Sequence, residues 1–487
     1  MNNRDGCRDA AFKPAYGRLL EVLVMHIQFS FSMPPISGVA ALLGQKKAAA
    51  RPDVRGEEFV AALELWLAPL HRLISSKPPA PTSDGVAAPR SSRVLAFTGA
   101  AHLRHRLVLS LLSRRPIRID GIRADDDEPG LRPHEVSFLR LIEKLTQGSR
   151  LEISYTGTSL LFHPGTIQGG AVTHQCPNDR GLGWFLEPLL ALAPFGKKDL
   201  SLTLRGLTTD GRDASVDTIR TSGLPHLAMF LEQEGVELRI TKRGHPPLGG
   251  GEVSFTCPSV RAVKSGFDFT STGRIAKIRG IAHSVRVSPQ LANRLVAAAR
   301  SVLNRYIPDI YIYTDVYRGE DSGKSPGYAI TLVGSSTSHV LHSAEASSCP
   351  PSTSSPSAER FTPPVPEDLG VLAARLLLDE IRRGGCVDRG WEWLVTTMLV
   401  LGAEDVGKVM LAGPFDAFLI EHLRDLKAFF GTTFKIRPVV RDSPSGEEAS
   451  GEDAAMASTR IGAAPGSQEF VLSCVGTGFT NTARRAG

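Results

Sequence analysis

The sequence predicts an α/β (α+β) protein built from three βαβαββ repeats, with a small α/β domain inserted between the second and third repeats. Two observations predict this fold class. From Val94 onward, short runs rich in β-branched and aromatic residues alternate with longer runs of helical periodicity. The same order of elements then returns along the chain, which indicates internal duplication. With 487 residues, the chain is long enough for two or three domains.

The first repeat is expected from Val94 to Phe162. Alternating apolar residues predict its strands and a period near 3.6 predicts its helices. The expected strands are residues 94–97, 117–122, 150–155 and 159–162, and the expected helices lie near 102–113 and 133–145. The order is therefore β-α-β-α-β-β.

A similar order recurs in the second and third repeats. In the second, which is expected from Gly170 to Leu238, we expect strands at 172–175 and 200–206 and helices near 182–193 and 216–232. The third repeat is expected from Leu369 to Ile436. The core of the protein would then consist of residues 94–273 and 367–481.

The inserted domain is expected at residues 274–340. A strand-like alternation at 278–287 leads into a helix with a well-marked start, because Ser288 can cap it and Pro289 suits the first helical position. Two further strands are expected at 310–314 and 328–333.

Three segments have compositions that do not favour a packed core. Residues 1–93 are expected to be a largely disordered extension, with one amphipathic helix at 57–74. Residues 341–366 form a Ser/Pro-rich linker, and 441–467 form a low-complexity loop rich in Ser, Gly and Glu.

The overall composition excludes several classes of protein. Hydrophobic residues make up 42% and charged residues 22%, and 56 Lys and Arg against 50 Asp and Glu give a net charge of +6. The six cysteines contain no C-x-x-C pair, which argues against a zinc site and against a disulfide-rich secreted scaffold. We therefore expect no metal site, and no apolar segment is long enough to predict a membrane span.

Positive charge is concentrated in two stretches. Seven cations and no carboxylate lie between Arg274 and Arg305, and Asp120 alone opposes the six arginines between Arg104 and Arg123. Such surfaces bind phosphates through counterion release, independently of sequence. The hypothesis is RNA or another polyanion, and the alternative is a set of solvated helix faces.

A glycine-rich turn adds to the anion-binding candidates. Residues 243–251 (RGHPPLGGG) precede a strand, and consecutive glycines let backbone N–H groups approach an anion closely. A tight turn without a ligand is the alternative, and the P-loop pattern is absent. The candidates for RNA or anion binding are Arg104, Arg106, Arg123, Arg243, Gly249, Gly250, Gly251, Arg274, Lys277, Arg279, Arg286 and Lys324.

One constellation is a nuclease candidate. Arg424, Asp425 and Lys427 lie in an expected helix at 418–430. The carboxylate could accept a 2'-OH proton while the flanking cations stabilise the developing phosphorane charge. The alternative is a solvated helix face.

Several ordered motifs together resemble the RNA 3'-terminal phosphate cyclase family, and within it the eukaryotic cyclase-like branch. They are residues 122–133 (IRADDDEPGLRP), 165–170 (GTIQGG), 243–252, 281–293 (IAHSVRVSPQLAN), 307–315 (IPDIYIYTD), 322–327 (SGKSPG), 383–388 (RGGCVD), 429–436 (FFGTTFKI) and 473–481 (SCVGTGFTN). The resemblance covers residues 94–481 and implies the three repeats and the inserted domain.

Two departures from the family pattern concern catalysis. The resemblance places an E-G-G-G-Q motif where this chain has residues 99–104 (GAAHLR). It also places a histidine that accepts AMP shortly after a G-G-x-V-D motif, where residues 384–388 (GGCVD) are followed by 389–393 (RGWEW). Adenylation needs that imidazole as a nucleophile. We therefore expect no ATP-dependent cyclization and no cofactor.

The resemblance implies a role in ribosome biogenesis. Members of the cyclase-like branch are nucleolar and act in early pre-rRNA processing that yields 18S rRNA and the small subunit. Their implied partners are pre-rRNA, a large ribosome-assembly GTPase and the small nucleolar ribonucleoprotein of the small-subunit processome, without a membrane. Two alternatives stay open: an endoribonuclease using Arg424, Asp425 and Lys427 for endonucleolytic cleavage, or a retained cyclase.

Overall fold

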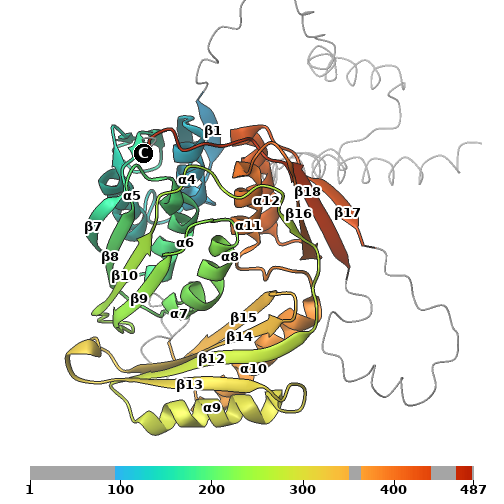
Figure 1. The fold of residues 1–487 in the computed structure, drawn as a ribbon. Coiled ribbons are helices and arrows are strands. Elements are labelled where there is room, and N and C mark those ends of the chain that lie inside the picture. Colours follow the sequence, from blue (N-terminus) through green and yellow to red (C-terminus); the bar gives the residue numbers. More distant parts are fainter. Residues whose placement is uncertain (1–93, 350–363, 440–467, 485–487) are drawn as a thin grey trace, which may run out of the picture. The chain divides into compact units, whose positions relative to one another are not determined.

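The fold in Figure 1 is that of a computed structural model, which describes residues 94–349, 364–439 and 468–484. The expected extension at 1–93 with its helix at 57–74, and the low-complexity loop at 441–467, lie outside the described residues. None of the described helices is long and apolar enough to cross a membrane.

Three four-stranded sheets share one strand order, which confirms the three predicted βαβαββ repeats. In each sheet the first two strands are parallel, and the last two join in antiparallel pairs. The strand orders are β1 (Leu95–Thr98), β2 (Ile117–Asp120), β5 (Leu160–His163), β4 (Arg150–Ile153); then β7 (Gly170–Gln175), β8 (Leu200–Gly206), β10 (Gly251–Cys257), β9 (Glu237–Lys242); then β11 (Asp268–Phe269), β16 (Val406–Ala412), β18 (Glu469–Val475), β17 (Lys435–Pro438).

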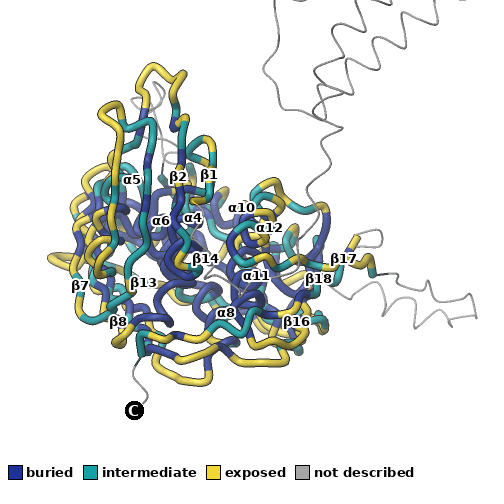
Figure 2. The backbone as a smooth tube through the Cα atoms, turned by 90° about the horizontal axis from the view of Figure 1, so that it is seen from above, coloured by how far each residue is buried: buried dark blue, intermediate teal, exposed yellow. Residues whose placement is uncertain are grey.

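The helices of the first two repeats and the last helix of the third lie where the periodicity predicts them, and the third repeat has one more helix for which the sequence predicted no bounds. They are α4 (Leu103–Ser113) and α5 (Pro133–Leu145); α6 (Leu182–Leu192), α7 (Val216–Thr218), the π-helical turn η2 (Ile219–Gly223) and α8 (Leu224–Ala228); and α11 (Glu392–Leu401) and α12 (Ala417–Phe430). Figure 2 shows α4, α6 and α11 buried along most of their length. Side chains such as Leu107, Phe185 and Leu394 are fully buried there, and the three repeats pack on one another through these helices.

The third repeat begins earlier than expected. Its first strand, β11, pairs in parallel with β16 and lies before the inserted domain, whereas the sequence pattern placed the start of this repeat at Leu369. A two-residue strand is too short to show a period, which explains the difference. The inserted domain therefore interrupts the third repeat after its first strand.

The inserted domain is larger than the predicted range of 274–340. It contains β12 (Ile275–Val285), α9 (Pro289–Leu303), β13 (Ile310–Tyr317), β14 (Gly327–Ser336), β15 (Leu341–Ser347) and α10 (Pro366–Arg383), with the strand order β13-β12-β14-β15. The predicted helix start is confirmed, because the Ser288 hydroxyl accepts a hydrogen bond from the Gln290 N–H (3.4 Å).

Two predicted boundaries need correction. Residues 341–347, assigned to the linker, form β15 and pair with β14, and α10, assigned to the last part of the core, packs on α9. The buried face of α10, with Leu369, Ala373 and Leu377, belongs to a hydrophobic cluster of the inserted domain. An apolar stripe predicts a packed helix but does not identify the core against which it packs.

Candidate functional site

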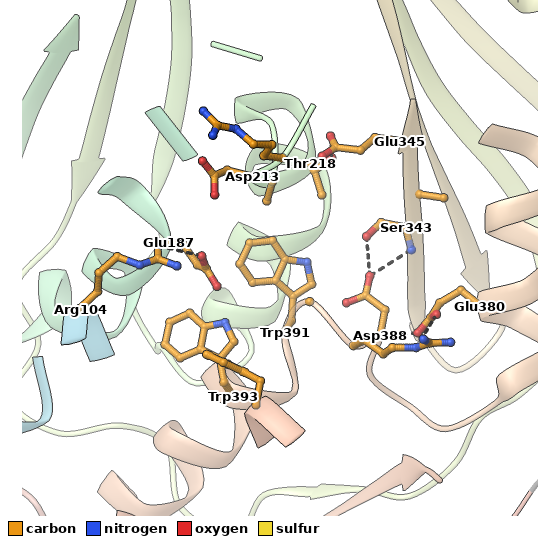
Figure 3. Close-up of a pocket in the computed structure, with 16 residues that line it drawn as sticks. Arg104, Glu187, Asp213, Thr218, Ser343, Glu345, Glu380, Asp388, Trp391 and Trp393 are labelled. Atoms are coloured by element: carbon orange, nitrogen blue, oxygen red, sulfur yellow. Dashed lines mark hydrogen bonds and ion pairs between the residues drawn. The ribbon is translucent and has the colours of Figure 1, made fainter. Parts of the chain in front are cut away.

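A cavity of about 450 Å³ lies where the three repeats and the inserted domain meet (Figure 3). Each of these parts contributes to its wall. The lining residues are Arg104 and Glu187 from α4 and α6, Arg212, Asp213, Ala214 and Thr218, Ser343, Ala344 and Glu345 from β15, Glu380 from α10, residues 388–391, Trp393, and Phe418 from α12. The two segments that depart from the cyclase pattern, 99–104 and 389–393, thus supply wall residues to one cavity.

Two tryptophans form much of this wall. Trp391 is 1% exposed and Trp393 2% exposed, and Figure 3 shows the two indoles adjacent to each other at the cavity. The Trp391 ring fits closely against the π-helical turn, since a Cβ atom added at Gly223 would lie 2.6 Å from it. Neither indole N–H has a hydrogen-bond partner among the described residues. Both indole nitrogens are themselves buried, and unpaired buried donors are uncommon in proteins.

The Asp388 carboxyl group is buried at the edge of the same cavity. Its Oδ2 accepts hydrogen bonds from the Ser343 N–H (3.0 Å), the Ser343 hydroxyl and the Ser222 hydroxyl (3.3 Å). Burial raises the pKa of Asp388 to about 7, and repulsion from Glu380 adds to the rise. Asp388 can therefore hold or release a proton near neutral pH.

The Glu392 carboxyl group lies beside this wall with a similar pKa. Burial raises the pKa of Glu392 to about 7, although it accepts a hydrogen bond from Arg383 (2.9 Å) that favours the charged form. Of two carboxyl groups with a pKa of about 7, Asp388 thus precedes the two tryptophans in the chain and Glu392 lies between them.

Arg104 is the cation that the first repeat contributes to the cavity. Its guanidinium donates to Glu187 (3.1 Å) and to the Trp184 carbonyl oxygen, and it lies 4.6 Å from the centre of the Trp184 ring. Its charge is therefore balanced inside the protein, although its side chain remains 16% exposed.

No histidine or cysteine lines the cavity within residues 94–349, 364–439 and 468–484. The neighbouring His105 packs against the rings of Trp393 (4.7 Å between ring centroids) and Phe418 (5.0 Å), both of which do line it. Burial holds the pKa of His105 well below its ordinary value, and Arg104 lowers it further. The imidazole is thus neutral and lies behind the aromatic wall.

The structure places Arg243, an anion-binding candidate, entirely inside the protein. Its guanidinium donates to Asp217 (2.5 Å) and Asp315 (2.9 Å), and the Arg243 side chain is 0% exposed. Arg243 therefore links the second repeat to β13 of the inserted domain. Its donors are occupied by carboxylates, which leaves them without capacity for a phosphate.

The glycine-rich turn is also largely occupied by internal hydrogen bonds. Gly249 (φ 62°) donates its N–H to the His245 carbonyl oxygen (3.0 Å), and its own carbonyl accepts from the Lys324 N–H (2.8 Å). Gly250 has φ 90°, and Gly251 is buried at the start of β10. Positive φ explains Gly249 and Gly250, and at Gly251 a Cβ atom would lie 2.7 Å from the Thr208 side chain. The geometry is that of a tight turn.

The nuclease candidates do not converge on one site. Asp425 is 3% exposed and accepts a hydrogen bond from Arg106 (2.8 Å), and burial raises the pKa of Asp425. Arg424 is exposed and paired with Glu421 (3.0 Å), while Lys427 lines a different cavity, next to the C-terminal segment. The group that would accept a proton is therefore bound to a guanidinium and shielded from RNA.

The remaining candidate cations divide by their partners. Arg106 is buried with Asp425, and Arg123 binds both carboxylate oxygens of Glu135. Arg279 is half-buried and binds Asp309 (2.8 and 3.0 Å). Arg286 is exposed and donates to the Ser322 and Gly323 carbonyl oxygens. Arg274, Lys277 and Lys324 are exposed and form no ion pair with a described residue.

Sequence reasoning did not identify Asp388, Trp391 and Trp393 as cavity residues. The signal was present, since W-x-W directly follows the G-G-x-V-D motif. The contribution of β15 could not be found, because residues 341–347 were assigned to a linker.

The described fold and cavity can be compared with known proteins. A family model described as RNA 3'-terminal phosphate cyclase matches residues 95–436. The RNA 3'-terminal phosphate cyclase-like protein of Homo sapiens is 49% identical over 391 residues. Two proteins named rRNA processing protein Rcl1 are also similar, from Schizosaccharomyces pombe (43% identical over 391 residues) and Saccharomyces cerevisiae (39% over 392). Each of these three alignments covers 80% of this chain and 97% of the relative. The chain therefore belongs to the RNA 3'-terminal phosphate cyclase family.

Proposed function

We propose that this protein is a ribosome-biogenesis factor that acts in pre-rRNA processing without cyclizing RNA ends. The observation that carries the proposal is the similarity to the yeast proteins named for rRNA processing, which extends over 97% of their length. Its place is early processing in the nucleolus, on the route to 18S rRNA and the small subunit.

The composition of the central cavity supports the absence of cyclization. Transfer of AMP to the enzyme requires a nucleophile such as an imidazole at the reacting phosphate. Among the described residues, the wall carries Trp391 and Trp393 and neither a histidine nor a cysteine. The family fold would then serve as a binding scaffold.

Exposed cations of the inserted domain and the adjoining loop supply the RNA-binding surface in this proposal. Arg274, Lys277 and Lys324 are exposed and form no ion pair with a described residue, and Arg279 and Arg286 are partly available beside them. Such contacts position RNA through its phosphates and are sensitive to salt.

The partners in this proposal are pre-rRNA, a large ribosome-assembly GTPase and the small nucleolar ribonucleoprotein of the small-subunit processome. A tagged copy of the chain, purified from nuclear extract, should bring down such a GTPase and small nucleolar RNA. Their absence from the purified material would contradict the assignment to this assembly.

The test of function is depletion of the chain in its own cells. We expect the ratio of 18S rRNA to large-subunit rRNA to fall and unprocessed precursors to accumulate on northern blots. An unchanged ratio after complete depletion would overturn the proposal.

The test of chemistry is incubation of purified protein with ATP labelled at the α-phosphate, alongside an RNA that ends in a 3'-phosphate. We expect neither labelled protein after denaturing electrophoresis nor a cyclic RNA end. A labelled band would mean that another nucleophile replaces the histidine, and the non-cyclizing proposal would fall.

The alternative of an endoribonuclease is disfavoured by the geometry of α12. Asp425 would need access to a 2'-OH, and it is buried against Arg106. The ion pair instead joins the third repeat to the first, which is a structural role.

A further inference from the structure

Two exposed tyrosines stand side by side on the inserted domain. Tyr311 is 54% exposed and Tyr313 58% exposed, and both lie on β13, two residues apart and hence on one face of the sheet. Their ring centroids are 4.5 Å apart at an interplanar angle of 80°, which is an edge-to-face contact. The pair is thus held in place before any ligand arrives, while much of each ring remains open to solvent.

Cations lie on the neighbouring strand. Arg279 of β12 is the register partner of Tyr311, and Lys277 lies two residues earlier on the same face. Arg279 is neutralised by Asp309, but Lys277 is exposed and forms no ion pair with a described residue. The tyrosines therefore lie beside an available ammonium group.

The sheet face is exposed around Tyr311 and Tyr313, whereas other parts of it are covered. Farther along the same face, His283 of β12 and Thr331 of β14 are buried, and Glu345 of β15 binds Ser215 and Thr218 of the second repeat. The core thus covers that part of the face. Around Tyr311 and Tyr313 the face stays open, whereas Asp315 farther along β13 binds Arg243 of the core. β13 is the outermost strand of the sheet (Figure 1).

We propose that Tyr311 and Tyr313 form a stacking platform for unpaired bases of single-stranded RNA, with Lys277 contacting the adjoining phosphates. The inference rests on the proposed RNA-binding function and specifies its ligand. Aromatic side chains bind single strands because every base offers a π-face, whereas bases in a duplex are already stacked and paired. A partner strand added to the β13 edge would use the backbone and would not require two solvent-facing rings beside a cation.

The experiment measures binding of fluorescein-labelled oligouridine and of a duplex RNA to the full chain by fluorescence anisotropy. The double variant Tyr311→Ala/Tyr313→Ala should lose at least about tenfold in affinity for the single strand, since it removes both rings on which bases would stack. The matched control, Tyr311→Phe/Tyr313→Phe, keeps both rings and should retain single-strand affinity. Duplex affinity should be the same in all three proteins.

The variant Arg274→Ala/Lys277→Ala separates this inference from the function on which it rests. If it loses RNA affinity while the tyrosine-to-alanine variant binds the single strand like wild type, the platform is overturned and cationic RNA binding stands. Loss of affinity in the phenylalanine variant would overturn stacking in favour of hydroxyl contacts. If the wild-type protein binds neither RNA, RNA binding by the inserted domain and the platform both fail.

Discussion

Arginines of the core and cations of the inserted domain give the same signal in the sequence and have opposite roles in the structure. Arg106 and Arg243 are buried and bound to carboxylates, whereas Arg274 and Lys277 are exposed and form no ion pair with a described residue. Asp425, the partner of Arg106, lies 319 residues away in the chain. A local count of charges cannot include such partners, so it overestimates the free cations of the core.

The difference has a physical consequence for each region. A buried guanidinium costs free energy of desolvation, which its carboxylate partners must offset, and removing one partner leaves the other uncompensated. An exposed cation stays solvated and is free to displace counterions from RNA. The core arginines therefore hold the repeats and the inserted domain together, and the exposed cations remain for a ligand.

The largest expected effect is on stability, at Arg243. Arg243→Met should lower the free energy of unfolding by about 3–5 kcal/mol, because it leaves Asp217 buried with only the partly exposed Arg220 as a counter-charge. Urea unfolding followed by circular dichroism measures the change. The matched control, Lys277→Met, should change stability by no more than about 0.5 kcal/mol. Equal effects of the two substitutions would contradict the comparison.

Substitution of Asp425 tests whether this residue has a structural role or a catalytic one. Asp425→Asn should lower the free energy of unfolding by about 1–3 kcal/mol, because it weakens a buried hydrogen bond to Arg106. The neighbouring Arg424→Ala removes a solvated ion pair and should cost about 0–1 kcal/mol. A nuclease would instead show unchanged stability in Asp425→Asn and loss of pre-rRNA cleavage. Unfolding curves and a cleavage assay on the same preparations separate these outcomes.

The Asp388 carboxyl group makes the free energy of unfolding depend on pH. Its pKa of about 7 in the folded state lies above that of an unfolded chain, so between about pH 5 and 7 the folded state keeps a proton that the unfolded chain has lost. Stability should therefore fall as pH rises through this window and level off above it. In the Asp388→Asn variant, the free energy of unfolding should fall by about 2 kcal/mol less across this window.

A control for this pH dependence lies in the inserted domain. Asp309 is exposed, and its hydrogen bonds from Arg279 lower the pKa of Asp309. Its carboxylate is therefore ionised in both folded and unfolded states throughout the window, and Asp309→Asn should leave the slope unchanged. Thermal unfolding at several pH values checks both variants. If stability changed equally with pH in the wild type and in Asp388→Asn, the raised pKa of Asp388 would be contradicted.

Most elements of the repeats were predictable because a strand or helix of several residues carries its own period, which the two-residue β11 does not. The start of α9 at Ser288 and Pro289 was predictable for the same reason, since a cap is a local signal. The membership of α10 and the partner of Arg106 depend on contacts between distant segments, which no local pattern contains. The same limit applies to the cavity, because its wall joins Arg104, β15 and Trp391 from separate parts of the chain.

The smallest expected effect on stability, and the sharpest on binding, is at Arg274 and Lys277. Arg274→Ala/Lys277→Ala should leave the free energy of unfolding within about 0.5 kcal/mol of wild type, since surface substitutions away from partners change little. If both cations contact phosphates, the slope of log affinity against log salt for single-stranded RNA should become shallower by about 1.4. Titrations at several salt concentrations measure it. A wild-type slope would place the RNA elsewhere on the protein, whereas a shallower slope at unchanged stability would establish that these exposed cations bind the RNA without stabilising the fold.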